Sequence, residues 1–175
     1  AQHRAKGAQH TGLDQAQVAS IRETLLATPG VLGLHELRTR RMAHQALVDA
    51  HVQVDARISV SEGHRIAESA RARVLREHSE VLDVLVHIDP EDDLDPDFAA
   101  MKLPGRATLL AELAPVLAGL PEPEKINLHY LGGQVEVEVF LDHGFFADSA
   151  ALRRAETEIA QRLSAHPKIR CLSLN

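Results

Sequence analysis

The spacing of apolar side chains predicts the same order of helices and strands twice along the chain. In the first part, residues 13–27 show helical spacing up to Pro29-Gly30, and residues 61–78 carry a second apolar stripe with Ser61 as the predicted N-cap. The predicted strands of this part are residues 31–40, 47–55 and 82–89. The order of elements in the first part is therefore α-β-β-α-β.

The second part of the chain repeats this order. Its predicted elements are residues 106–118, 125–131, 134–142, 149–165 and 168–174, with Gly132-Gly133 as a hairpin turn. A short echo, Gly33-Leu34-His35-Glu36-Leu37 against Asn127-Leu128-His129-Tyr130-Leu131, indicates a duplication. We therefore predict the α+β class, with two tandem ferredoxin-like (metallochaperone-like) α-β-β-α-β units. In each unit we expect an antiparallel sheet with its helices on one face.

Polar and charged segments divide the chain into parts. We predict a flexible tail at residues 1–12, a first unit at 13–90, an acidic linker bounded by prolines at 91–104 and a second unit at 105–175.

Composition excludes several classes of protein. The 175 residues are 45% apolar and carry a net charge of −6, which fits a globular chain and gives no basic footprint for nucleic acid. The longest apolar stretch, Leu109–Leu120, is interrupted by Glu112 and is too short to span a bilayer. A single cysteine excludes a disulfide framework and a cysteine-rich zinc cluster.

Histidine is the residue type that points to chemistry. Eight of the eleven histidines lie in residues 1–90, and strand alternation places His51, His87 and Asp89 on the face away from the core. His35 falls near the middle of the first strand, so these side chains converge if the strands are neighbours. Imidazole nitrogens with a carboxylate suit tetrahedral Zn²⁺, and other divalent cations fit the same donors.

Three other functions stay open from the residues alone. A single surface histidine is usually a solvated polar group, so a purely structural interaction domain accounts for the same pattern. A stand-alone zinc metallochaperone has the same ligands. A metallohydrolase needs a pocket and a general base, for which the sequence offers no candidate, so we expect no enzyme.

Four segments in order resemble one family, the C-terminal cytoplasmic domain of cation diffusion facilitator (cation efflux) transporters. They are Pro29-Gly30-Val31 leading into His35-Glu36-Leu37-Arg38-Thr39-Arg40, then Val48-Asp49-Ala50-His51-Val52, then Gly63-His64-Arg65-Ile66-Ala67-Glu68, and finally Val86-His87-Ile88-Asp89-Pro90. The resemblance covers about residues 13–90. It implies that His35, His51, His87 and Asp89 bind Zn²⁺, with His64 a ligand or a neighbour that completes the site of the other subunit.

The resemblance also implies a function. The first unit is expected to be a Zn²⁺-sensing, homodimerising regulatory domain whose other partner is the transmembrane domain of the same transporter, which is absent from this chain. The expected location is the cytoplasmic face of the membrane, with this fragment itself soluble. The second unit is expected to be a copy with a degenerate metal site. There His129 stands at the place of His35, and Glu138, Ser173 and Asn175 stand at the places of His51, His87 and Asp89.

Overall fold

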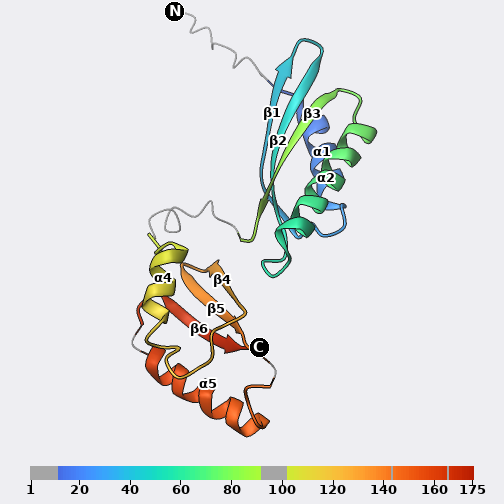
Figure 1. Cartoon of the computed structure of the whole chain (residues 1–175). Helices are drawn as coiled ribbons and strands as arrows, with labels where there is room; N and C mark the ends of the chain where they lie inside the picture. Colours follow the sequence, from blue (N-terminus) through green and yellow to red (C-terminus); the bar gives the residue numbers. More distant parts are fainter. Residues whose placement is uncertain (1–11, 92–101, 143, 165) are drawn as a thin grey trace, which may run out of the picture. The chain divides into compact units, whose positions relative to one another are not determined.

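The computed structural model describes residues 12–91, 102–142, 144–164 and 166–175. The chain forms two compact units, residues 1–94 and 95–175, and each is described by itself (Figure 1). Except for Gly12, the predicted tail at residues 1–12 lies outside the described residues, as does most of the predicted linker at 91–104.

The first unit has the predicted order of elements. They are α1 (Gln15–Leu26), β1 (Gly33–Met42), β2 (Gln45–Gln53), α2 (Val60–Glu77) and β3 (Val81–Asp89). The predicted cap of α2 was wrong by two residues: Ser59, not Ser61, has the extended backbone and accepts a hydrogen bond from the Glu62 N–H. The helix therefore begins at Val60.

The second unit repeats this order with α4 (Arg106–Leu113), β4 (Lys125–Leu131), β5 (Gln134–Phe140), α5 (Ser149–Leu163) and β6 (Ile169–Leu174). The Gly132-Gly133 turn is confirmed, since both residues have the positive φ that a two-residue hairpin turn requires. Helix α4 ends five residues before the predicted end. Pro115 has no N–H to donate to the carbonyl four residues earlier, so the helix ends at Leu113 although Ala114 still has helical backbone angles.

The α+β class with two similar three-stranded sheets is confirmed, but the expected all-antiparallel pairing is wrong. In sheet A, with the order β1-β2-β3, strand β2 pairs antiparallel with β1 and parallel with β3. Sheet B, with the order β4-β5-β6, has the same mixed pairing. The reason is the connection: a helix between two neighbouring strands returns the chain to the same end of the sheet, so the second strand runs parallel to the first.

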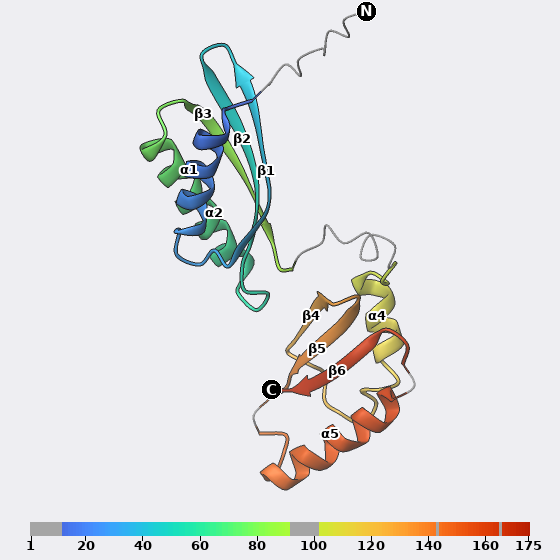
Figure 2. The same cartoon turned by 180° about the vertical axis from the view of Figure 1, so that it is seen from behind.

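Both helices of the first unit pack on one face of sheet A (Figures 1 and 2). The alternation predicted for β2 is confirmed, because Val48, Ala50 and Val52 are buried. Val48 and Ala50 pack in one core cluster with Ile21 and Leu25 of α1 and with residues of α2. In the second unit, Leu109, Leu113, Ile159 and Leu163 from the two helices pack in the same way on buried valines of β5. Among the described residues of each unit, no helix packs on the opposite face of its sheet. We call it the outer face.

Candidate metal centre

The outer face of sheet A carries most of the predicted ligands. Strand alternation brings Asp49, His51 and Gln53 of β2 to this face, and the parallel register places His87 beside His51 and Asp89 beside Gln53. The convergence of His51, His87 and Asp89 that strand parity suggested is therefore present in the fold.

His51 lies at the centre of this group. Its ring stacks on the ring of His87 with 4.3 Å between the centroids and 13° between the planes. Its Nδ1 atom lies 3.0 Å from Oδ2 of Asp89. Because an ionised carboxylate only accepts hydrogen bonds, this contact requires the proton on Nδ1, and in the neutral ring the lone pair then lies on Nε2. A carboxylate that fixes a histidine in this way is a common arrangement behind metal-binding imidazoles.

Glu36 is a member of the group that strand parity did not reveal. The pairing of β1 with β2 skips His35, so His35 is the extra residue of a β-bulge and Glu36 lies opposite His51. The Oε2 atom of Glu36 is 4.0 Å from Nε2 of His51. The spacing of Leu34 and Leu37 carries the signal for this bulge. Both pack against the core although they are three residues apart, which a regular strand does not allow.

His35 and His64 occupy different surroundings from His51. His35 lies at the bulge, and its Nε2 atom is shielded from solvent. His64 is an exposed residue of α2 that lines a cavity of about 360 Å³ together with Val86 and Ile88, whose side chains point to the helix side of the sheet. Within one chain, the fold thus separates His64 from the group around His51.

No group of three or more His, Cys, Asp or Glu side chains in the described parts of the chain is already arranged to hold a metal ion. The donors around His51 are the right chemical types, but as placed in a single copy they are engaged with each other or spread over the face. Movement of side chains or donors from another molecule are needed to complete a metal shell.

Asp83 lies in the edge strand β3 and bonds to Arg71 of α2, and the pKa of its carboxyl is clearly shifted. The N–H of Val84 donates to Oδ1 at 2.8 Å, and Arg71 donates to the same oxygen at 2.8 and 3.0 Å. The Val84 hydrogen bond first, and then the Arg71 guanidinium, lower the pKa of the Asp83 carboxyl below its ordinary value.

The second unit has different chemistry on its outer face. Glu138 lies opposite Ser173 in the same register as His51 opposite His87, and Asn127 donates to Glu138. His129 pairs with Glu136 in the register, and its Nε2 lies 3.1 Å from Oε2 of Glu138. The predicted equivalence of His129 with His35 is therefore wrong: Asn127 is the residue opposite Glu138, and β4 has no bulge to shift it.

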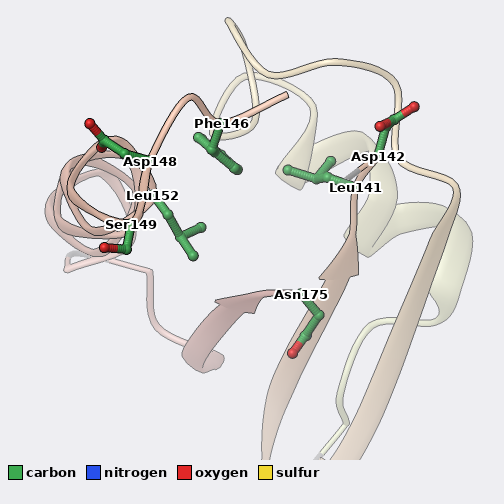
Figure 3. Close-up of a pocket in the computed structure, with 7 residues that line it drawn as sticks. All are labelled: Leu141, Asp142, Phe146, Asp148, Ser149, Leu152 and Asn175. Atoms are coloured by element: carbon green, nitrogen blue, oxygen red, sulfur yellow. The ribbon is translucent and has the colours of Figure 1, made fainter. Parts of the chain in front are cut away.

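Each unit also has a cavity at the loop between its middle strand and second helix. The cavity of the second unit, about 270 Å³, lies between Phe146, Leu152 and Asn175 (Figure 3). The corresponding cavity of the first unit is the one that His64 lines. Neither cavity is lined by His51 or His87, so the group around His51 lies on an open sheet face.

Comparison with known proteins places the first unit. Residues 13–91 match the family described as cation efflux protein, cytoplasmic domain. Metal tolerance protein C1 of Arabidopsis thaliana is 42% identical over 74 residues, which is 42% of this chain and 16% of that protein. Cation-efflux pump FieF of Pectobacterium atrosepticum is 32% identical over 71 residues, 41% of this chain and 23% of the pump. The chain thus spans no more than about a quarter of the length of these relatives.

Solved structures of MamM CTD are also similar to the chain. One is 26% identical, with a TM-score of 0.43, over 43% of this chain and 96% of the MamM chain. Others bear the descriptions nickel form, manganese form and cadmium form. A TM-score at this level carries no argument about function, so the assignment depends on the sequence matches.

No helix in the described parts of the chain has both the length and the apolar character needed to cross a bilayer. The sequence matches cover the same stretch that contains α1 to β3 and the group around His51. Residues 13–91 of this chain therefore belong to the family of cation efflux protein cytoplasmic domains.

Proposed function

We propose that the first unit binds a divalent cation, Zn²⁺ foremost, on the outer face of sheet A and thereby regulates a cation efflux transporter. The observation that carries this proposal is the meeting of His51, His87, Asp89 and Glu36 at one place on a sheet face that no helix covers. Two imidazoles and two carboxylates are donors of the kind that Zn²⁺ takes in proteins.

The donor set passes a simple geometric test. Tetrahedral coordination with bonds of about 2.0–2.2 Å sets two ligand atoms roughly 3.3–3.6 Å apart. The 4.0 Å between Nε2 of His51 and Oε2 of Glu36 approaches this separation and closes with a small rotation of either side chain. His87, stacked on His51, is near enough to supply a second nitrogen. His35, adjacent to Glu36 at the bulge, is a further donor, as the family resemblance implies.

We further propose that the site is completed in a homodimer. One copy has no finished group of three donors among its described residues, and its outer face exposes Leu85 and His87 to solvent. A second copy that faces it would add donors, with His64 of the partner a candidate. A bound cation would offset the repulsion among the carboxylates. Metal then shifts the monomer–dimer equilibrium only because the dimer binds it more tightly.

The other partner in this proposal is the transmembrane domain of the same transporter, with the first unit at the cytoplasmic face of the membrane. A regulatory role fits the open position of the group around His51 better than catalysis does. A metallohydrolase holds its metal in a concave pocket, and neither His51 nor His87 lines the cavity at the strand–helix loop of either unit. The family matched by residues 13–91 comprises transporter domains and not enzymes.

The test combines metal binding with association. The full chain, a His51→Ala/His87→Ala variant and a His44→Ala control are titrated with ZnCl₂ by calorimetry and followed by sedimentation velocity. His44 is an exposed histidine in the β1–β2 turn and is absent from the group around His51.

We expect the wild type and the control to bind Zn²⁺ with the same affinity and to become dimeric. The double variant should bind at least about 100-fold more weakly, since even partners outside the coordination shell are worth about 10–100-fold. Equal binding by all three proteins, with no change in sedimentation, would overturn the proposal.

A further inference from the structure

Glu36 reaches the metal-binding face because of an irregularity in β1. Leu34 and Leu37 both pack on the core, and the bulge at His35 places Glu36 opposite His51 between them. If β1 continued from Leu34 as a regular strand, Glu36 would lie opposite Ala50 and point to the core side of the sheet. Bulges commonly redirect a side chain next to a functional site, and this one turns the Glu36 carboxylate toward the His51 imidazole.

The contact between Glu36 and His51 is unusual. Asp89 accepts from Nδ1 of His51, so in the neutral ring the Nε2 atom presents a lone pair toward Oε2 of Glu36. Two acceptors therefore face each other at 4.0 Å, a distance too long for a hydrogen bond. This arrangement is favourable once a cation lies between them.

Arg38 holds the other oxygen of Glu36. Its Nε and Nη2 atoms donate to Oε1 at 2.8 and 2.7 Å, while Oε2 is the oxygen that faces His51. The guanidinium thus fixes the direction of the carboxylate and leaves one oxygen available. Because the Arg38 side chain is 72% exposed, this clamp is weak enough to yield to a metal ion.

We propose that Glu36 is a direct ligand of the divalent cation, paired with Nε2 of His51. The inference rests on the proposed function and assigns Glu36 a role within it. A carboxylate oxygen in the place of a third imidazole favours harder cations, so Glu36 also sets the preference between Mn²⁺ and Zn²⁺.

The experiment compares two carboxylates on the same face. Glu36→Gln and Asp49→Asn each remove one negative charge from the outer face of sheet A. Asp49 lies opposite Arg38 and two residues before His51 in β2. Calorimetry with ZnCl₂ and MnCl₂ on the full chain measures both affinities, and the electron paramagnetic resonance spectrum of bound Mn²⁺ reports its ligands. Glu36→Asp, with the carboxylate kept, and His51→Ala/His87→Ala complete the set.

We expect Asp49→Asn to weaken both metals by about two- to fivefold, the effect of a screened charge. Glu36→Gln should weaken Zn²⁺ by about tenfold or more and Mn²⁺ by a larger factor, with a changed Mn²⁺ spectrum, while Glu36→Asp regains part of the loss. Equal effects of Glu36→Gln and Asp49→Asn would overturn this inference alone. Unchanged binding in the double histidine variant would instead overturn the proposed function.

Discussion

The hydrogen bond between His51 and Asp89 makes a prediction about the protonated nitrogen of His51. In the metal-free chain the 3.0 Å contact requires the proton on Nδ1. Replacing Asp89 by Ala removes the acceptor, and the 4.0 Å neighbour Glu36 then becomes the nearest carboxylate, on the Nε2 side. We expect the proton of neutral His51 to move to Nε2 in Asp89→Ala.

The size of this effect follows from the exposure of the pair. A hydrogen bond to a charged group contributes about 1.5–3 kcal/mol, and partial exposure of both side chains (31% for His51 and 14% for Asp89) reduces it to about 1–2 kcal/mol. Since about 1.4 kcal/mol is a factor of ten, the ratio of the two tautomers should change by about five- to thirtyfold. Asp89→Asn keeps a neutral acceptor and should change the ratio less.

The assay is long-range ¹H–¹⁵N NMR of the imidazole nitrogens at a pH where His51 is neutral, with His44 as the internal control. Metal titration of the same samples gives the functional consequence. We expect Asp89→Asn to lose at least about tenfold in Zn²⁺ affinity, and Asp89→Ala to lose more. A wild-type His51 with its proton on Nε2, or a tautomer ratio that Asp89→Ala leaves unchanged, would refute the reasoning.

Three further predictions concern the rest of the chain. Arg38→Ala releases Glu36 and removes a nearby positive charge, so the Zn²⁺ affinity measured by calorimetry should rise by about threefold or more. The control Arg40→Ala, two residues further along β1, should change this affinity by less than about twofold. The lowered pKa of Asp83 contributes stability that is present above its ordinary pKa of about 3.9 and is lost as pH falls through the folded-state pKa. Asp83→Asn should therefore make the free energy of unfolding depend less on pH below about pH 4. At neutral pH it should cost no more than about 1 kcal/mol in denaturant melts, because the Asp83 side chain is 54% exposed. Leu25→Ala leaves a cavity at a fully buried position of the first unit and should lower the free energy of unfolding of that unit by about 2–5 kcal/mol in denaturant melts. If the NMR signals of α5 and β6 vanished together with those of α1 in the Leu25→Ala melt, the division into two units would be contradicted.

The strand elements and much of the site could be predicted from alternation alone. Val48, Ala50 and Val52 show which face of β2 is buried, and that assignment places His51 on the other face. The same logic applied to β3 places His87 and Asp89. These predictions succeed because a half-buried strand has a period of two, which the sequence records directly.

The remaining features depend on information that alternation does not carry. The parallel pairing of β2 with β3 follows from the helix between them, and only that pairing fixes His87 beside His51. Glu36 needs the bulge, for which the three-residue spacing of Leu34 and Leu37 is the single signal. In the second unit, the match of Leu128-His129 with Leu34-His35 led to a wrong equivalence between His129 and His35. Strand β4 has no bulge, so the same pair of residues falls in a different register.

The most direct test of a metal site on the outer face of sheet A is a Zn²⁺ titration followed by ¹H–¹⁵N correlation spectra of the full chain. We expect the largest shifts in residues 34–38, 49–53 and 85–89, which are the stretches of β1, β2 and β3 around His51, with the outer face of sheet B unchanged. Shifts confined to β4 and β6, or spread evenly over the exposed histidines of the chain, would contradict the account.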